Sequence, residues 1–481
     1  MNIIKIRKFV KYILRFYIIY AFIFGVLLFG LYNPASTEEL EDDSIEVFHG
    51  QELSQDRVVL MEERNDSGVS RVNLIENAEK TLDIAYYTLH DGVSTDIFFS
   101  SIIEAADRGI KVRILLDGIF HNLNGNLRGI RYIFSAHPNI ELRFYEPLNL
   151  IKPWTWNNRL HDKFIIVDEK YAIIGGRNIG DKYFIGDETD DHIVYDRDVV
   201  IINTDEGNVS NSVISEFKDY FNHLWDHDYS KSPVNRLTNM DKRKGEEKYQ
   251  YLVNRVEKLE KTHPEIFNNS IDWIEESVPV NKISLIYNPI ERLNKEPWCW
   301  YYITNLANNA EESIYVQSPY IIPTKDMLNI LHVENISVDR EQINILTNSI
   351  HSSPNPFAIS GYMNNRKRVV DFVANVYEFQ GPGSIHAKSY IFDNRISAVG
   401  SFNFDSRSAF LSTESMVIID SKDFAKHLEE EMDKYISNSL IIGEDYSYLP
   451  DSVVEEGEIP LLKLIVVRVL SVVVYLFQFM L

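Results

Sequence analysis

The sequence predicts an α/β protein built from two tandem copies of one domain, each a mixed sheet flanked by helices, behind an N-terminal transmembrane helix. Two observations carry this prediction. A pattern of His, Lys, Asp, Gly and Asn occurs twice with the same offsets, and its histidines, His161 and His386, stand 225 residues apart. Strand-like and helix-like runs alternate in the same order before each copy. Such a repeat indicates duplication of a whole domain, with the copies related by a pseudo-twofold axis.

Length and charge narrow the class of protein. The chain has 481 residues, enough for two domains of ordinary size with appendages. Its net charge is -23, whereas a nucleic-acid binder usually shows a basic balance or stripe, so we expect no nucleic-acid partner. The single cysteine, Cys299, forms no internal disulfide and no cysteine metal cluster, and we interpret it as a small buried residue.

The N-terminus has the pattern of a membrane anchor. Residues 1–15 carry basic side chains and no acid, residues 16–32 carry no charge, and an acidic run follows at residues 38–43. This order predicts a cytoplasmic N-terminus and places the rest of the chain on the outer side. We favour an uncleaved signal anchor over a cleaved signal, because no clean A-x-A site follows the apolar run.

The segment after the anchor, residues 33–68, is acidic and polar and is interpreted as a linker. The first domain then covers residues 69–229. Its expected elements are a helix at 73–80, a strand at 82–88, a helix at 100–108 ended by Gly109, a strand at 112–118, a hairpin of 163–167 with 171–174, and a strand at 199–202.

The second domain, residues 281–445, repeats this order. Residues 309–316 echo 77–84, residues 342–347 echo 111–116, and a helix followed by a strand is expected over 369–378. Between the domains, residues 230–280 are highly charged and are expected to form solvated helices that bridge the two domains.

The repeated motif has the composition of a phosphoryl-transfer site. A neutral imidazole can attack phosphorus and form a covalent intermediate, or carry a proton near neutral pH. The developing negative charge then needs donors around it. In His-x-Lys on a strand, both side chains point to the same side, so each copy supplies half of one site. The candidate donors are Lys163, Lys388, Asn178 and Asn403.

This H-x-K-x4-D-x6-G-[GS]-x-N pattern, at residues 161–178 and 386–403, resembles the phospholipase D superfamily and, within it, bacterial cardiolipin synthases. The resemblance covers about residues 69–445 and implies two tandem phospholipase D-like domains. One departure is Gly176, where much of the superfamily has Ser, whereas Ser401 keeps the hydroxyl in the second copy.

The resemblance also implies roles for the motif residues. His161 is the expected nucleophile and His386 the expected general acid and then base. Asp168 and Asp393, which complete the two motifs, are implied to anchor their hairpins rather than to give protons to substrate.

Each histidine needs a carboxylate to hold its tautomer. In the second copy Glu414 stands at the start of a strand, and in the first copy Asp196 occupies the matching position. The resemblance assigns Asp196 to His161, with Asp198 as the alternative.

The implied reaction is transfer of a phosphatidyl group between phospholipids through a phosphohistidine, with phosphatidylglycerol or phosphatidylethanolamine as expected lipids and no cofactor. The expected location is the bacterial cytoplasmic membrane, with the catalytic domains outside. The alternatives are a lipid hydrolase or nuclease of the same fold and an inactive membrane-bound interaction protein. The sequence leaves the oligomeric state open.

The last segment, residues 446–481, ends in an apolar run from Leu461. Its four polar residues fall within one arc of a helix, which favours a helix lying in the membrane interface. A second membrane span is the rival, but it would enter with Lys463 and Arg468 on the outer side, against the usual bias.

We expect activity to survive chelation, because the lysines supply the positive charge and no metal-ligand motif is present. The measurement is turnover in EDTA with and without added divalent ions. Complete loss in EDTA that a divalent ion restores would contradict this account.

Overall fold

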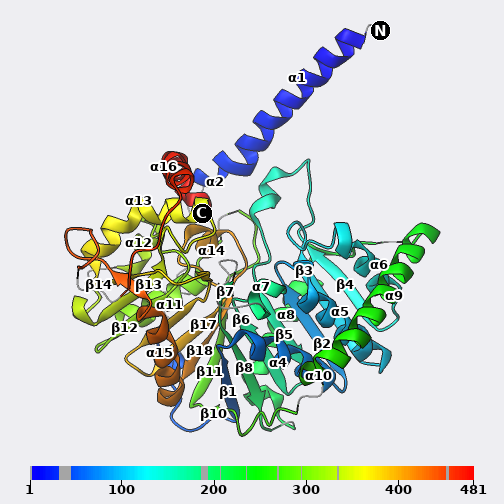
Figure 1. The fold of residues 1–481 in the computed structure, drawn as a ribbon, viewed down its shortest axis with the longest axis horizontal. Coiled ribbons are helices and arrows are strands. Elements are labelled where there is room, and N and C mark those ends of the chain that lie inside the picture. Colours follow the sequence, from blue (N-terminus) through cyan, green and yellow to red (C-terminus); the bar gives the residue numbers. More distant parts are fainter. Residues whose placement is uncertain are drawn as a thin grey trace.

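The computed structural model describes residues 3–31, 45–185, 193–205, 207–234, 236–267, 270–293, 295–332, 335–450 and 454–481. Two sheets lie side by side, one from each half of the chain, with helices on their outer sides (Figure 1). The acidic run at 38–43 lies outside the described residues.

The two sheets confirm the duplication, because eight strands occur in the same spatial order in both. The first sheet is ordered β10 (Val278–Pro279), β1 (Asp56–Met61), β8 (Asp198–Asn203), β6 (Tyr171–Gly175), β5 (Lys163–Val167), β2 (Thr81–Tyr86), β3 (Lys111–Asp117), β4 (Ile140–Tyr145) and β9 (Ser230–Lys231). The second is ordered β11 (Lys282–Tyr287), β18 (Ser415–Asp420), β17 (Ile396–Gly400), β16 (Ser389–Phe392), β12 (Ile314–Gln317), β13 (Ile343–Asn348), β14 (Asn375–Phe379) and β19 (Ser439–Ile441).

Both sheets are mixed, as expected. In each, three central strands are parallel and carry crossover helices, and the motif strand forms an antiparallel hairpin with the next strand. The helices of the first half are α4 (Arg64–Glu76), α5 (Val93–Asp107), α6 (Arg128–Ala136), α7 (Asp181–Phe184), α8 (Val213–Asp226), α9 (Asn239–Thr262) and α10 (Pro264–Phe267). Those of the second are α11 (Trp298–Asn308), α12 (Lys325–Leu331), α13 (Pro356–Phe372), α14 (Ser406–Phe410), α15 (Lys422–Ile436) and α16 (Leu461–Leu476).

The two halves share one apolar core along their boundary. It combines side chains from both sheets, such as Phe164 and Val199 from the first and Ile391 and Val417 from the second, with those of α8 and α15. Each half also has its own core on the outer face of its sheet. The boundary between the halves is therefore a continuous apolar core, as the interior of each half is.

The first half begins earlier than residue 69. Of the segment interpreted as a linker, residues 56–61 form β1 within the first sheet, and α4 starts at Arg64 instead of residue 73. The apolar pattern hid the start of this helix because the buried face is polar there, while Val72, Leu74 and Ile75 are buried further along. Arg71, for example, is buried and donates to the Tyr86 hydroxyl (3.0 Å) and to the Asp198 carboxylate (3.0 Å).

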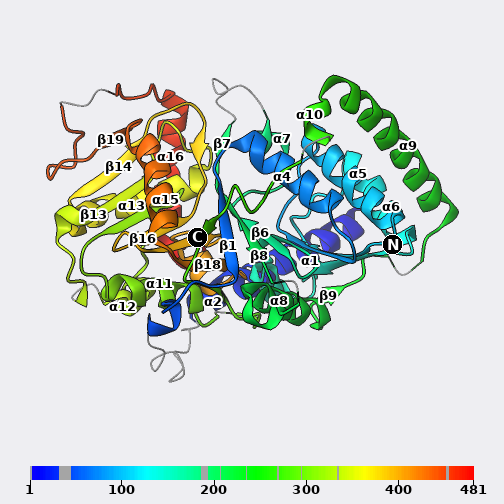
Figure 2. The same ribbon diagram turned by 90° about the horizontal axis from the view of Figure 1, so that it is seen from below.

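The charged segment between the copies forms helix α9, as predicted, but it does not bridge the two halves. It lies along the outer side of the first half, against α5 and α6 (Figure 2). Asp96 of α5, which is buried, binds Lys248 (3.0 Å) and Arg255 (3.0 Å) of α9. A capping box between Thr238 and Asp241 starts the helix.

The N-terminal helix projects from the body (Figure 1). It runs as α1 (Ile3–Phe22), one π turn (Ile23–Leu27) and α2 (Leu28–Gly30). Among the described residues it is the one helix, over 6–30, that is long and apolar enough to cross a membrane. Near the C-terminus, α16 lies on α13, with Val467 and Val474 buried between them and most of its other apolar side chains exposed.

Each hairpin of the motif is fixed by its aspartate. The Asp168 carboxylate accepts the backbone N–H groups of Glu79, Lys80 and Thr81 at 2.8–2.9 Å. The Asp393 carboxylate accepts those of residues 311–313 in the same way. Both aspartates stand at the end of the motif strand away from its histidine, so their geometry is that of anchors.

We therefore expect Asp168→Ala to lower the free energy of unfolding by about 1–3 kcal/mol, because three N–H groups lose a charged acceptor. Turnover per folded molecule should stay near that of the wild type. Chemical denaturation and active-site titration measure the two effects. Glu169→Ala is the control, since its exposed pair with Lys218 contributes only about 0–1 kcal/mol. A folded, fully stable Asp168→Ala that has lost turnover would contradict the anchoring role.

Candidate active site

The two motif histidines lie where short parallel bridges join the two halves of the chain. The His161 N–H donates to the Thr413 carbonyl (3.2 Å), and the His386 N–H donates to the Tyr195 carbonyl (2.6 Å). The second bridge includes a two-stranded sheet of β7 (Val194–Tyr195) and β15 (Ser384–Ile385). The same backbone contact thus occurs twice, once from each half to the other.

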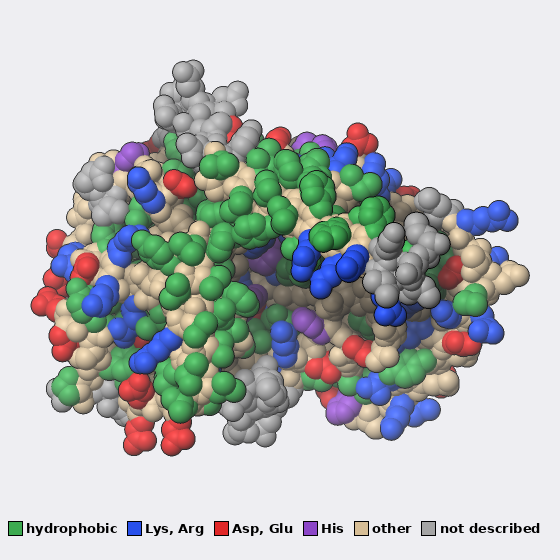
Figure 3. All heavy atoms as spheres, turned by 90° about the horizontal axis from the view of Figure 1, so that it is seen from above, with side chains coloured by type: hydrophobic (Ala, Val, Ile, Leu, Met, Phe, Trp, Pro, Cys, Tyr) green, Lys and Arg blue, Asp and Glu red, His purple; other side chains and the backbone are tan. Residues whose placement is uncertain are grey.

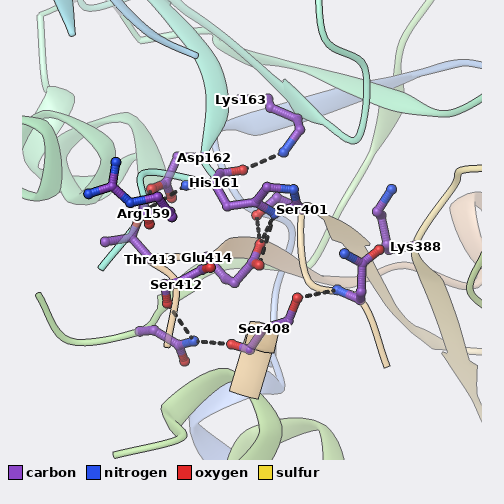
Figure 4. A network of polar contacts seen from close by, with 12 residues as sticks. Arg159, His161, Asp162, Lys163, Lys388, Ser401, Ser408, Ser412, Thr413 and Glu414 are labelled. Atoms are coloured by element: carbon purple, nitrogen blue, oxygen red, sulfur yellow. Dashed lines mark hydrogen bonds and ion pairs between the residues drawn. The ribbon is translucent and has the colours of Figure 1, made fainter. Parts of the chain in front are cut away.

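These bridges give each histidine a carboxylate from the other half. Glu414 follows Thr413, and its carboxyl oxygen lies 2.9 Å from Nδ1 of His161 (Figure 4). Asp196 follows Tyr195, and its Oδ2 lies 2.6 Å from Nδ1 of His386. With Nδ1 held in this way, Nε2 of each imidazole is left for chemistry.

The predicted pairing of Asp196 with His161 is therefore wrong, and so is the alternative, Asp198. Asp198 is buried in ion pairs with Arg71 (3.0 Å) and Arg177 (2.9 Å) inside the first half. The order along the chain suggested partners within one copy. The bridges exchange the carboxylates between copies, and no spacing within either copy shows this.

At His386 the electrostatics favour an ionised carboxylate. Burial, helped by the neighbouring Lys388 ammonium, lowers the pKa of His386 to about 3. Burial raises the pKa of Asp196, but Lys388 and His386 outweigh burial and hold that pKa below its usual value. The resting pair is thus a neutral imidazole beside a carboxylate anion, an arrangement that stabilises a proton arriving on the ring.

At His161 the carboxyl group is in a different state. Burial raises the pKa of Glu414 to about 8, although Lys163 and the Ser401 hydroxyl oppose the rise. Burial, with Lys163 and Lys388, holds the pKa of His161 well below its usual value. A neutral imidazole is the form that can act as a nucleophile.

The two lysines face one shared site. Lys163 donates to the His161 carbonyl and Lys388 to the His386 carbonyl. Lys388 also acts on the pKa of His161, and Lys163 acts on that of His386. Burial lowers the pKa of Lys163 to about 7 and also lowers that of Lys388. The motif therefore converges from both copies, as the sequence predicts.

The supporting residues differ between the copies. Ser401 donates to Glu414 (2.5 Å), whereas a Cβ at Gly176 would lie 2.1 Å from Oδ1 of Asp196. A serine at position 176 would collide with the carboxylate, which explains that departure from the pattern. The side-chain oxygens of Asn178 and Asn403 are buried and have no hydrogen-bond partner among the described residues.

The site opens into a cleft of about 240 Å³ beside His161. His161, Asn403 and Glu414 are the lining residues that were predicted from the sequence, whereas Tyr87, Trp156 and Arg407 are among those that were not. The ring of Tyr87 packs edge-on against His161 at 4.9 Å. Arg407 lies four residues after Asn403 of the second motif, and this proximity was a sequence signal for its place at the site. Its guanidinium donates to the Met480 carbonyl (2.7 Å). No group of three His, Cys, Asp or Glu side chains suited to a metal ion occurs in the described ranges.

Comparisons with known proteins agree with this geometry. The family described as "Cardiolipin synthase, PLD-like domain" matches residues 72–225 and 303–436. Cardiolipin synthase C of Escherichia coli K12 is 28% identical over 414 residues, covering 77% of this chain and 82% of that protein. An uncharacterized protein of Helicobacter pylori 26695 is 28% identical over 422 residues, 79% of each chain.

A solved structure, the phosphatidylserine synthase of Haemophilus influenzae Rd KW20, shares the fold. It superposes with a TM-score of 0.60 at 15% identity, over 88% of this chain and 95% of that one. The lipid enzymes among the relatives, together with the apolar N-terminal helix, indicate a membrane protein. The two matched regions coincide with the two halves that build the site, so the chain belongs to the phospholipase D family of enzymes, with two cardiolipin-synthase-type domains in one polypeptide.

Proposed function

We propose that this protein is a phosphatidyltransferase of the cardiolipin-synthase kind, which moves a phosphatidyl group from one phospholipid to a hydroxyl of another. The observation that carries the proposal is the exchanged pairing of two neutral histidines with carboxyl groups, with both lysines beside them. The similarity to cardiolipin synthase C supports the choice of lipid substrates. Phosphatidylglycerol or phosphatidylethanolamine is the proposed donor.

In the first half-reaction, Nε2 of His161 attacks phosphorus, and the bond from phosphorus to the leaving alcohol breaks. His386 delivers a proton to the leaving oxygen. The phosphodiester brings a negative charge into the cleft, which favours proton binding by His386, and the Asp196 anion stabilises the imidazolium. We assign the general-acid role to His386 and the nucleophile role to His161 because the ionised carboxylate, Asp196, stands beside His386 and not beside His161.

In the second half-reaction, the acceptor hydroxyl gives its proton to His386 and attacks phosphorus. The nitrogen–phosphorus bond then breaks and releases His161 as a neutral ring. Lys163 and Lys388 stabilise the charge on the phosphoryl oxygens in both steps. The side-chain oxygens of Asn178 and Asn403, which have no hydrogen-bond partner among the described residues, can accept a hydrogen bond from a substrate hydroxyl.

The proposed location is the outer surface of the cytoplasmic membrane. The uncharged part of the N-terminal helix, residues 16–30, spans about 15 residues or ~23 Å, less than the ~30 Å of a hydrocarbon core. The helix also contacts the body from early in this stretch. The Tyr17 hydroxyl donates to the Leu150 carbonyl (3.1 Å) and the Tyr20 hydroxyl to the Ile151 carbonyl (2.6 Å).

The body must therefore sit partly in the outer leaflet, and its surface suits that position. Figure 3 shows hydrophobic side chains gathered on this face, around a hollow where histidine side chains are visible. The exposed apolar residues include Leu148, Leu150 and Ile151 of the loop beside the anchor and Val469 and Val472 of α16. This collar would hold the cleft at the level of the lipid headgroups.

The carboxylate exchange predicts unequal effects of two isosteric changes. Asp196→Asn should lower turnover about 10⁴-fold, because an amide cannot both hold the Nδ1–H tautomer and stabilise the imidazolium. Glu414→Gln should cost about 10²-fold, because Glu414 is protonated at neutral pH. Single-turnover kinetics of donor consumption measure both, with the exposed Glu169→Gln as control. Equal losses would be inconsistent with the assigned roles.

The function itself is tested by lipid mass spectrometry of membranes with and without the expressed protein. Wild type should produce cardiolipin, and His161→Asn or His386→Asn should lower turnover by about 10²–10⁴-fold or more. The control is the exposed His263→Asn. The phosphohistidine should map to the peptide that contains His161. Near-normal turnover in His161→Asn would refute the shared site, and phosphatidic acid in place of cardiolipin would indicate a hydrolase.

The collar is tested by Val469→Asp/Val472→Asp on the exposed side of α16, where these side chains are 62% and 68% exposed. Activity on vesicles should fall, because charged side chains oppose insertion, while activity on detergent-dispersed lipid should persist. Met240→Asp on α9, 59% exposed, is the matched control. A reporter fused after Leu481 that reads as cytoplasmic would rule out the interfacial position and establish a second span.

A further inference from the structure

A cavity of about 190 Å³ lies inside the second half, on the outer side of its sheet. Its walls come from α11, α12, α13 and strands β12 and β13, and include Trp300, Ala307, Ile345 and Phe404. Protein interiors contain few voids larger than a water molecule, so a cavity of this size calls for an explanation.

The first half shows what fills the same space there. Leu89 bridges Ile179 just after the first motif asparagine, and Ile321 bridges Phe404 just after the second. In the first half a helix, α5, starts four residues after Leu89, and in the second half a helix, α12, starts four residues after Ile321. The first-half helix, α5, has 15 residues, whereas its counterpart α12 has 7. The first half has a pocket of about 40 Å³ between the starts of α4 and α5, but it does not reach the sheet, where Ile75 is fully buried.

In the described part of the chain, α12 therefore has no residues that match Ile102 and Ile103, which α5 buries in the first half. A second difference enlarges the space. Residues 309–316 match 77–84, so Ala307 of α11 corresponds to Ile75 of α4. The small side chain lines the cavity, while the larger one is fully buried in the first-half core.

The lining suits hydrocarbon and not water. Of the described residues around the cavity, the only charged one is Arg368, which is exposed at the rim and donates to the Pro323 carbonyl (3.3 Å). A buried water needs two to four polar partners, and the lining offers almost none. A void of ~150 Å³ already accepts benzene, so this one has room for a longer hydrocarbon segment.

The cavity also adjoins the active site. Phe404, in its wall, directly follows Asn403, which lines the cleft. Tyr390, another wall residue, stands two positions after Lys388, and its hydroxyl is buried without a hydrogen-bond partner in the described part of the chain. That hydroxyl is a donor available to an ester carbonyl of a lipid whose headgroup occupies the cleft.

From the cavity between α11, α12 and the second sheet we infer a binding site for one acyl chain of the phospholipid substrate. The inference rests on the proposed function for the identity of the lipid. It explains why, among the described residues, Ala307 lines a cavity in the second half where the first half has the buried Ile75. The first half keeps a packed core, so the two copies divide the work between them, with one holding the chain and both supplying the chemistry.

The first test is crosslinking without turnover. Full-length His161→Asn in detergent micelles is irradiated with phosphatidylglycerol that carries a diazirine near the end of one acyl chain. Label should map to α11 and α12 and be competed by unlabelled phosphatidylglycerol. A diazirine-bearing free fatty acid should label these helices much less. Equal labelling by the fatty acid, or label confined to α16 and the anchor helix, would overturn the inference.

The second test fills the cavity. Ala307→Phe in the same background should abolish the label on α11 and α12, while Asn329→Phe, which adds the same ring on the exposed side of α12, should keep it. If Ala307→Phe does not fold, Ala307→Ile supplies the residue of the first half and should weaken the label. Unchanged label in the folded, filled variant would overturn the site.

In the active enzyme, we expect Ala307→Phe to lower kcat/KM for a long-chain lipid about 10-fold relative to kcat/KM for a short-chain lipid. This is the loss expected when about two methylene groups of the substrate are no longer buried. Activity on the short-chain lipid should be retained. The crosslink needs no catalysis, so a chain-binding site can fail while transfer persists. Conversely, absence of phosphatidyl transfer in the wild type and in every variant would refute the proposed function. The acyl-chain site would then be tested by the crosslinking result alone.

Discussion

The structure depends on two parallel backbone bridges that join the halves beside the histidines. Because the residue after each bridge is the carboxylic acid that holds the opposite histidine, neither half contains a working imidazole by itself. The shared apolar core and the buried Arg197, which donates to Gln317 (2.7 Å) and Ser389 (2.9 Å) across the boundary, keep this register fixed. A small shift between the halves would separate both acid–histidine pairs at once.

Much of the fold followed from repetition in the sequence. The strands around each motif were found because apolar runs of the right length flank residues with fixed offsets, as for β5 with β6 and for β12. The start of helix α4 was missed because polar side chains such as Arg71 face inward there and satisfy buried partners. Strand β1, whose Val58, Val59 and Leu60 are buried, was missed because it lies in a segment that is acidic and polar overall and was therefore interpreted as a linker. Periodicity reports which side chains are apolar, and it cannot show that a buried face is built from ion pairs.

The motif residues were predictable for the same reason, whereas their partners were not. A carboxylate that acts across a domain boundary has no fixed sequence distance from its histidine, so Asp196 was assigned to the wrong ring. The cleft residues Tyr87 and Trp156 come from the bend after β2 and from a short 3-10 helix (Pro153–Asn157), whose positions depend on packing. Gly176 and Ser401 show that the copies have diverged around their acids, which gives the two histidines different electrostatic surroundings despite the common ancestry of their motifs.

The contact between the anchor helix and the body determines how substrate reaches the cleft. Asn157, which lines the cleft, donates to the Gly25 carbonyl of the anchor helix at 2.8 Å. The anchor helix therefore helps to position the wall of the cleft and does not merely attach the body to the membrane. With the phospholipid substrates proposed above, an enzyme held this way samples lipids by lateral diffusion in two dimensions. Its saturation is then set by the number of substrate molecules per unit of membrane area, and dilution of the whole suspension leaves its rate unchanged.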